Sequence, residues 1–348
     1  MATQLIFTAP KKVGYIDLPL ADPRPGEVVA KTIISGISHG TEMTGFMGTS
    51  PFITKTMTPQ RTFRDKKPGD GEFYPFHHAG YDAVGIVEKV GEGVSNYRAG
   101  DRVWYGANHQ TGFVFRADAA DALKLPAAIP DEEAIMTNLA VVALTAVHDA
   151  EILLGGVVAV SGGGTVGQLA AQLVFLNGAR RVFFIEPNKD RRAFAAARSA
   201  VEPIDPTAGS AALQIFDRNG GLPPDVVIEC SGHVAGLAGA VAAAGIAGTV
   251  IAAGFYAGSA AALCFGEEFL HNRVTLKASM GVWDCPDRHP ERWNRPRMLR
   301  VAHHLMEQRQ LRLDGFVSGK FPFTEGQRAY EAIEKEPGRY LKAAFVYQ

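Results

Sequence analysis

Up to about residue 130, apolar and polar residues alternate in short runs separated by turns. The runs are rich in β-branched residues, as in "EVVAKTIISG" (27–36), "AVGIVEKVGEGV" (83–94) and "DRVWYG" (101–106). Runs of this kind are typical of half-buried strands joined by turns. The pattern therefore predicts a mostly antiparallel, barrel-like β domain over residues 1–130.

From residue 131 onward, apolar strands alternate with helices. The expected elements are strands in "GVVAVSGGG" (156–164), "RRVFFIE" (180–186), "PDVVIECSG" (224–232) and "GTVIAAG" (248–254), and helices near 165–177, 189–200 and in the small-residue stretch 233–248. Successive βα units of this length imply a parallel sheet with helices on both faces. Residues 131–289 are therefore predicted to form a doubly wound α/β domain.

The C-terminal part returns to the first pattern. A helix is expected in "RPRMLRVAHHLMEQRQL" (295–311), followed by a strand in "GFVSGKFPF" (315–323), another helix and a closing strand at 342–348. This part is too short to fold alone, so residues 290–348 are expected to complete the first domain. His303 and His304 are expected to face solvent on their helix.

Composition excludes several classes of function. The chain has 348 residues and a net charge of −1, so its overall field attracts neither nucleic acid nor an anionic membrane. Its three cysteines, Cys230, Cys264 and Cys285, are too scattered for a disulfide scaffold and indicate a cytoplasmic setting. The N-terminus has no signal-peptide pattern. The uncharged stretch 230–266 is broken by glycines and does not indicate a membrane span.

The strongest motif follows the first strand of the α/β domain. Gly162, Gly164 and Gly167 form G-x-G-x-x-G at the start of a helix, with Thr165 and Val166 inside the turn. The glycines allow a tight turn, close approach of a pyrophosphate, and close packing of helix on strand. The phosphate would meet free N–H groups and the positive end of the helix dipole.

The second strand ends in Glu186, 24 residues after Gly162. A carboxylate at this place hydrogen-bonds the adenosine ribose and repels a 2′-phosphate, so NAD(H) is expected rather than NADP(H). Arg191 and Arg192 are interpreted as solvated helix residues, although Arg191 could lie along the adenosine.

Together these motifs resemble the medium-chain dehydrogenase/reductase superfamily over nearly the whole chain. The resemblance rests on the glycine motif, "GYDAVGIVEKVGEGVSNYRAGDRV" (80–103), "DVVIECSG" (225–232), "GTVIAAG" (248–254) and "FPFTEGQRAYEAIEKEPGRYLKAAFVY" (321–347). It implies a GroES-like catalytic domain interrupted by a Rossmann domain, with the active site in the cleft between them. It also implies a homodimer or homotetramer, and cofactor contacts at Gly254 and Phe255.

Zinc-binding members of this superfamily hold the metal with cysteine, histidine and a further cysteine or glutamate. The matching positions here are His39, Tyr81 and Thr137, and only histidine is a good zinc ligand. Asp82 lies beside the site, but one histidine and one carboxylate make a poor zinc site. The structural zinc lobe is replaced by "WYGANHQTGFV" (104–114). No metal is therefore expected.

The stretch "SGISHGTE" (35–42) together with "GYDAVG" (80–85) resembles a zinc-lacking branch that contains bacteriochlorophyllide a dehydrogenase-type members. The pigment substrate is not carried over to this chain.

Without zinc, side chains must handle the proton and charge on the substrate oxygen during hydride transfer. Tyr81 can donate or accept through its hydroxyl, and His39 has a side chain suited to proton exchange near neutral pH. Thr41 matches the hydroxyl residue that relays protons in zinc-binding relatives. Asp82 could orient Tyr81 or His39, and Glu42 lies next to the relay. For Glu42 and Asp82, a purely structural role is an equal alternative.

Two further features stay open. A structural role is preferred to a functional one for His109. In the long loop 47–75, four basic residues could recognise an anionic substrate or could form a solvated face: Arg61, Arg64, Lys66 and Lys67.

The sequence thus predicts a zinc-independent, NAD(H)-dependent oxidoreductase that interconverts an alcohol and a carbonyl in a small-molecule substrate. One alternative is an NADPH-dependent quinone or enoyl reductase of the same superfamily. The other is a non-catalytic protein that binds the cofactor.

Overall fold

The computed structural model describes residues 1–281 and 292–348. The chain forms two compact units, residues 1–138 with 313–348 and residues 139–312. Cys285 and the predicted domain boundary at residues 289–290 lie outside the described residues.

The first unit is built on a seven-stranded sheet. Its strands are β3 (Glu27–Ile37), β6 (Ala83–Val90), β7 (Arg102–Tyr105), β8 (Gly112–Arg116), β9 (Ala122–Lys124), β16 (Val317–Pro322) and β17 (Lys342–Val346). Their order is β16-β17-β3-β6-β7-β9, with β8 also paired to β3. All described pairs in this sheet are antiparallel except β16 with β17. The C-terminal strand thus pairs directly with β3, and the predicted mostly antiparallel β domain is confirmed.

Smaller elements surround this sheet. They are the hairpin β1 (Ala2–Ala9) and β2 (Lys12–Leu18), α1 (Thr41–Met47), the pair β4 (Lys55–Met57) and β5 (Phe63–Asp65), α2 (Asp131–Ala134) and α9 (Gly326–Lys335), with single 3-10 turns at Pro51–Ile53 and Phe323–Glu325. In the loop 47–75, Arg64 donates two hydrogen bonds to the Asp70 carboxylate, at 2.5 and 2.8 Å. This arginine therefore ties the loop together, which favours the structural interpretation of its charge.

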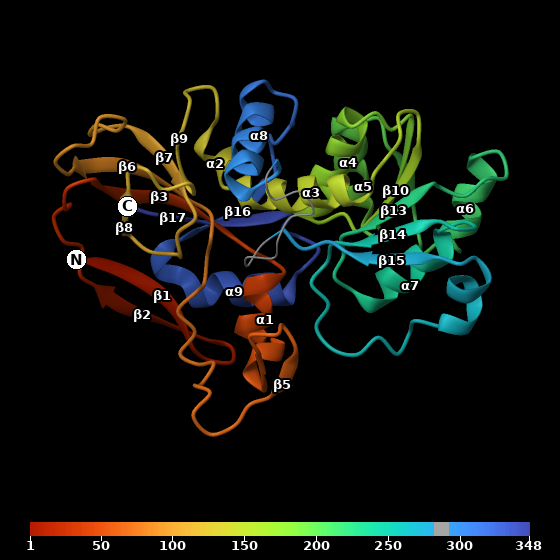
Figure 1. The fold of residues 1–348 in the computed structure, drawn as a ribbon, viewed down its shortest axis with the longest axis horizontal. Coiled ribbons are helices and arrows are strands. Elements are labelled where there is room, and N and C mark those ends of the chain that lie inside the picture. The colour runs from red at the N-terminus through yellow and green to blue at the C-terminus, as the bar shows by residue number, and fades with distance from the viewer. Residues whose placement is uncertain (282–291) are drawn as a thin grey trace. The chain divides into compact units, whose positions relative to one another are not determined.

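The second unit contains a six-stranded, fully parallel sheet (Figure 1). Its strands are β10 (Val157–Ser161), β11 (Arg181–Ile185), β12 (Glu202–Ile204), β13 (Val226–Glu229), β14 (Thr249–Ala252) and β15 (Thr275–Ala278). The spatial order β12-β11-β10-β13-β14-β15 reverses direction between β10 and β13. A reversal of this kind is the point at which doubly wound sheets bind their ligands.

Helices cover both faces of this sheet. The helices of this unit are α3 (Thr137–Asp149), which begins at the end of the first unit, α4 (Thr165–Leu176), α5 (Lys189–Arg198), α6 (Ala211–Arg218), α7 (Val234–Ala243) and α8 (Arg295–Glu307), with a π-helical turn at Phe265–Phe269. Figure 1 shows α4 and α5 on one face and α7 on the other. The predicted doubly wound parallel sheet is therefore confirmed. Within the described residues, no helix is both long and apolar enough to cross a membrane.

Helix α8 groups with the second unit, whereas the sequence pattern assigned residues 290–348 to the first. Two hydrogen bonds tie the segment that follows α8 to α4 of the second unit. The Gln172 side chain accepts from the Arg312 backbone N–H at 2.7 Å and donates to the Arg312 carbonyl at 3.3 Å. Trp293, just before α8, packs edge-on against His148 of α3 at 4.4 Å.

The prediction that both histidines of α8 face solvent is wrong for His303. The His303 side chain is buried, whereas His304 is exposed. Burial lowers the pKa of His303 to about 4, so this imidazole is neutral at neutral pH. Adjacent helix positions point about 100° apart, so two neighbouring residues rarely share one environment.

A buried carboxylate organises the polar interior of the first unit. Glu42, in α1, is 2% exposed. One of its oxygens accepts from the Ser38 backbone N–H at 2.8 Å. The other is 2.8 Å from His109 Nε2 and accepts from the Tyr330 hydroxyl at 2.6 Å. These bonds join the loop before α1, the segment before β8 and α9.

The same network continues beyond the imidazole. His109 Nδ1 lies 2.7 Å from the Ser35 hydroxyl of β3, and that hydroxyl lies 2.7 Å from the Tyr347 hydroxyl. The His109 ring also packs edge-on against Phe345 of β17. Glu42 and His109 therefore hold the unit together, which is the structural interpretation left open for both.

Electrostatics show that Glu42 is ionised in the folded protein. Burial raises the pKa of this carboxyl, but attraction to His109 and the three hydrogen bonds outweigh it and leave the pKa below its usual value. A carboxyl with a depressed folded-state pKa adds stability above its ordinary pKa of 4.5, and this stability is lost as the pH falls through the folded-state value.

Glu42→Gln should therefore lower the free energy of unfolding by about 2–3 kcal/mol at pH 7, because hydrogen bonds to a charged group are replaced by neutral ones. The difference from wild type should shrink below pH 4.5, where the wild-type carboxyl must itself take up a proton. Chemical denaturation at pH 7 and pH 4 measures both values. Glu334→Gln, which removes only a surface ion pair with Lys11, serves as the control. An equal loss for Glu42→Gln at both pH values would contradict the argument.

Candidate functional site

The glycine turn after β10 lies where the sheet order of the second unit reverses. Gly162 has a φ of +93°, a left-handed conformation that favours glycine. A Cβ at this position would lie 2.5 Å from the Ser231 backbone nitrogen, at the end of β13. The turn therefore brings the ends of β10 and β13 into contact.

Gly167 and Gly164 have different surroundings. A Cβ at Gly167 would lie 1.8 Å from the Gly162 carbonyl oxygen, so α4 can lie this close to β10 only without a side chain there. A Cβ at Gly164, which caps α4, would meet no atom within 4 Å. Open space thus adjoins the end of a 12-residue helix whose first N–H groups have no acceptor within the helix. This arrangement fits a pyrophosphate.

Glu186 lies at the end of β11, beside the glycine turn. Its carboxylate accepts from the backbone N–H of Gly163 at 2.5 Å and from that of Asn188 at 2.8 Å. A carboxylate offers about four acceptor positions, so capacity remains for ribose hydroxyls. A Cβ at Gly163 would lie 2.7 Å from Glu186 Cγ, which explains why the middle residue of the turn is also glycine. The residues present therefore fit a nicotinamide dinucleotide.

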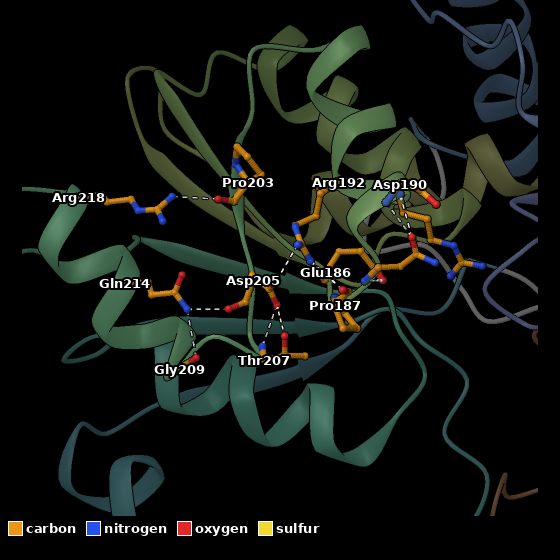
Figure 2. A network of polar contacts seen from close by, with 12 residues as sticks. Glu186, Pro187, Asp190, Arg192, Pro203, Asp205, Thr207, Gly209, Gln214 and Arg218 are labelled. Atoms are coloured by element: carbon orange, nitrogen blue, oxygen red, sulfur yellow. Dashed lines mark hydrogen bonds and ion pairs between the residues drawn. The ribbon is translucent and has the colours of Figure 1, made fainter.

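Arg191 and Arg192, which follow on α5, were both expected to be solvated. Arg192 is not solvated: its side chain is 15% exposed and bonded to Asp205 and to two backbone carbonyls, as Figure 2 shows. The prediction for Arg192 is wrong because a long side chain on α5 reaches the end of β12, which sequence spacing does not reveal. Arg191 is partly exposed, and its carbonyl accepts from the Gln168 side chain at 2.9 Å. A cofactor contact for Arg191, as for Thr165 and Val166, stays a prediction.

The loops after β13 and β14 meet at Gly254. A Cβ there would lie 2.4 Å from the Gly232 backbone nitrogen, and the Gly254 N–H donates to the Glu229 carbonyl at 3.2 Å. Phe255 follows with a partly buried side chain. These contacts place Gly254 and Phe255 at the carboxyl edge of the parallel sheet, and their role in cofactor binding stays a prediction.

A pair that the sequence did not predict, the buried Glu229 and the partly buried Tyr256, lies at this edge. The Tyr256 hydroxyl donates to the Glu229 carboxylate, which also accepts from the Ser231 N–H at 2.9 Å. Burial and the neighbouring Glu229 raise the pKa of Tyr256, so the phenol keeps its proton. The pair ties the loops after β13 and β14 together. An acid at the end of an apolar strand is the sequence signal that marks Glu229.

In the first unit, Asp82 is linked to the Tyr81 backbone through Asn138. One Asp82 oxygen accepts from the Trp104 indole N–H at 2.9 Å and from the Asn138 backbone N–H at 3.1 Å. The Asn138 side chain donates to the Tyr81 carbonyl at 2.5 Å. Asp82 is fully buried. These bonds make Asp82 a positioning residue for the Tyr81 backbone.

The Tyr81 side chain is partly buried. Burial raises the pKa of its phenol, and a hydrogen bond with the Ser38 side chain opposes this while the charges of Asp82 and Glu42 add to it. The pKa stays well above the ordinary value of 10. Tyr81 is therefore a neutral hydrogen-bond donor at neutral pH.

The other sequence-predicted positions of the first unit are His39, Thr41 and Thr137. His39 and Thr41, on either side of the Gly40 cap of α1, are partly exposed. The Thr137 hydroxyl donates to the Ala134 carbonyl at 2.7 Å. Across residues 1–281 and 292–348, no three histidine, cysteine, aspartate or glutamate side chains converge as a metal site would require.

A second missed group is Lys342, the first residue of β17. Its side chain is 1% exposed, and its ammonium has no hydrogen-bond partner in the described part of the chain. Burial lowers the pKa of Lys342, while attraction to Asp82 and Glu42 acts in the opposite direction. Two buried carboxylates and one buried ammonium thus share the interior of this unit. A lysine that begins an otherwise apolar strand is the signal that could have identified it.

Comparisons with known proteins agree with this architecture. Residues 25–126 match the alcohol dehydrogenase GroES-like domain, and residues 165–294 match the zinc-binding dehydrogenase family. The D-guloside 3-dehydrogenase of Shigella flexneri is 25% identical over 352 residues, which cover 99% of both chains. The 2-desacetyl-2-hydroxyethyl bacteriochlorophyllide A dehydrogenase of Rhodobacter capsulatus is 27% identical and covers 97% of this chain and 96% of its own.

The chain belongs to the medium-chain dehydrogenase/reductase superfamily, in its zinc-type alcohol/polyol dehydrogenase-like group. The structure of 2R,3R-butanediol dehydrogenase from Bacillus subtilis superposes with a TM-score of 0.77 over 99% of both chains, at 20% identity, which confirms the fold. The protein is an oxidoreductase that acts on CH–OH groups, as predicted from the sequence. The alternative of a non-catalytic cofactor-binding protein is therefore wrong.

The two glycines of the turn allow a test of the cofactor site. Gly164→Ala should leave the fold intact, because its Cβ enters open space, yet weaken NADH binding at least tenfold by filling the pyrophosphate position. Gly167→Ala should lower the melting temperature instead, because its Cβ meets the Gly162 carbonyl and displaces α4. Calorimetry and NADH titration measure the two effects. Unchanged NADH affinity in folded Gly164→Ala would place the dinucleotide elsewhere.

Proposed function

We propose that this protein is a zinc-independent, NAD(H)-dependent oxidoreductase that interconverts a secondary alcohol, polyol or sugar hydroxyl and the corresponding carbonyl. The observation that carries the proposal is Tyr81. It stands where zinc-binding relatives have a ligand, and its phenol remains protonated at neutral pH. A neutral donor beside the substrate oxygen can stabilise developing negative charge without a metal ion.

The side chains at the predicted zinc-ligand positions support metal independence. The three positions that match zinc ligands are His39, Tyr81 and Thr137, and only histidine is a good ligand. The Thr137 hydroxyl already donates to a backbone carbonyl. The nearby carboxylates of Asp82 and Glu42 are buried and hydrogen-bonded to groups of the protein.

When bound, the nicotinamide dinucleotide supplies the hydride acceptor or donor. Gly162, Gly164 and Gly167 would hold its pyrophosphate, and Glu186 its adenosine ribose. In the first unit, Tyr81 donates a hydrogen bond to the substrate oxygen, and Asp82 and Asn138 fix the Tyr81 backbone. His39, which is partly exposed, exchanges the proton with solvent, and Thr41 relays it.

The substrate class follows from the relatives. Two of the relatives that match over nearly their whole length are named for a D-guloside and for a hydroxyethyl-bearing pigment, and another relative is named for butanediol. The compounds in these names all carry a hydroxyl group on carbon. Each of these relatives is named as a dehydrogenase and not as a reductase of a C=C bond, which is the reaction of the alternative quinone or enoyl reductase. The Glu186 carboxylate also disfavours the NADPH which that alternative requires.

Tyr81→Phe and His39→Ala should each lower kcat by about a hundredfold to ten-thousandfold, the usual contribution of a proton-handling group. NADH affinity should change little, because the proposed cofactor contacts lie in the other unit. The pH profile of wild-type kcat should show no inflection from Tyr81 near neutral pH, because burial raises the pKa of its phenol. The assay uses secondary alcohols, polyols, sugars and their carbonyls.

The matched control is Tyr105→Phe, which removes a hydroxyl from a tyrosine stacked on Phe113 in the same sheet. The enzyme should contain no stoichiometric zinc and should keep its activity after dialysis against a chelator. Activity within about threefold of wild type in both Tyr81→Phe and His39→Ala would make them structural residues. One tightly held zinc per chain, with activity lost on its removal, would refute metal independence.

Cofactor choice is tested separately. Wild-type protein should bind NADH more tightly than NADPH, because Glu186 would stand next to the 2′-phosphate. Glu186→Gln keeps an acceptor for the Gly163 N–H but removes the charge, so NADPH should gain about tenfold relative to NADH. Fluorescence titration measures both affinities, with Glu202→Gln as a carboxylate control on the neighbouring strand. Tighter binding of NADPH by the wild type would overturn the proposal.

A further inference from the structure

The ends of β11 and β12 are joined by Arg192, which begins at α5 and reaches across to Asp205 (Figure 2). One terminal nitrogen of the guanidinium donates to the carbonyls of Glu186 and Pro187, at 2.5 and 2.8 Å. The other donates to Asp205 Oδ2 at 2.6 Å. The Arg192 guanidinium is therefore hydrogen-bonded to the backbone carbonyl of Glu186, whose side chain is expected to bind the ribose.

Asp205 is itself held in place by a turn. Its Oδ1 accepts from the Thr207 backbone N–H at 2.9 Å and from the Thr207 hydroxyl at 2.6 Å. Its carbonyl accepts from the Gln214 side chain at 2.7 Å. The hydrogen bonds from Thr207 and the charge of Arg192 lower the pKa of this carboxyl, so Asp205 is ionised at neutral pH. Oδ2 is left pointing at the guanidinium.

This geometry has a consequence for the choice between NAD and NADP. Arginine is well suited to bind phosphate, and an arginine next to the ribose would attract a 2′-phosphate despite Glu186. Asp205 neutralises that charge and occupies the guanidinium edge that would otherwise donate to the phosphate. Asp205 is therefore placed to act beside Glu186 in the proposed choice of cofactor.

We propose that Asp205 is a specificity-determining residue, which acts through Arg192 and withholds its guanidinium from the 2′-phosphate of NADP(H). The inference rests on the proposed NAD(H) dependence and deepens it. A merely structural bond between α5 and the end of β12 would affect the binding of both dinucleotides equally. A specificity role changes the ratio of the two affinities.

Asp205→Asn is the most direct variant. It keeps an acceptor for Thr207 but places an amide NH₂ where Arg192 now meets a carboxylate oxygen. The terminal nitrogen that donates to Asp205 loses this acceptor, while the other keeps its two backbone carbonyls. NADPH affinity should rise about tenfold relative to NADH affinity, since a hydrogen bond to a charged group contributes at least that factor. The gain should increase further in Asp205→Asn combined with Glu186→Gln. Adding Arg192→Met to either variant should abolish the gain due to Asp205.

NADH and NADPH titrations of each purified full-length variant provide the measurement. Glu202→Gln, which breaks the Arg181–Glu202 ion pair between the same two strands, should leave the ratio unchanged. If Asp205→Asn does not fold, Thr207→Val can replace it. This change at an exposed residue removes one hydrogen bond to the Asp205 carboxylate and should shift the ratio of NADPH to NADH affinity in the same direction.

An unchanged ratio in folded variants, or a gain that survives Arg192→Met, would overturn the role of Asp205 while leaving NAD(H) dependence intact. Tighter binding of NADPH than NADH by the wild type would instead overturn the proposed cofactor choice. The shift between wild type and Asp205→Asn would still decide whether Asp205 controls the ratio.

Discussion

The close approach of α4 to β10 is the constraint on which the nucleotide-binding unit depends. The helix meets the strand at a point where a single added methyl group would lie 1.8 Å from a carbonyl oxygen. This approach aims the first turn of α4 at the reversal in strand order and leaves open space in front of it. It also brings the Gly163 N–H to the Glu186 carboxylate, so one turn sets both the proposed phosphate position and the proposed ribose position.

The first unit depends on a different kind of interaction, the burial of charge. Glu42, Asp82 and Lys342 are each at most 2% exposed, and transferring such groups from water is costly unless they are paired or hydrogen-bonded. Glu42 is compensated by three hydrogen bonds, and Asp82 by bonds from an indole and a backbone N–H. The carboxylates add negative charge near Tyr81, which helps to keep its proton in place. The stability of this unit and the proposed chemistry therefore share one set of residues.

Some of the residues discussed above belong to short sequence motifs, whereas others depend on contacts between distant parts of the chain. The glycine turn and Glu186 are recognisable in the sequence because strand, turn and helix follow one another within about 25 residues. Arg192, His303 and Lys342 could not be assigned in the same way. Arg192 meets a residue 13 positions away, His303 is buried while its neighbour is exposed, and Lys342 lies near Asp82, which is 260 positions earlier in the chain.

The sequence alone determined the two architectures and the order of most strands and helices. These features depend on hydrophobic periodicity, turn residues and short motifs, which act over a few neighbouring residues. The tertiary structure alone decided that α8 groups with the nucleotide-binding unit, that Glu42 and His109 form a buried pair, and that Asp205 restrains Arg192. Each of these results depends on which side chains meet after folding, and no local pattern encodes a contact between distant segments.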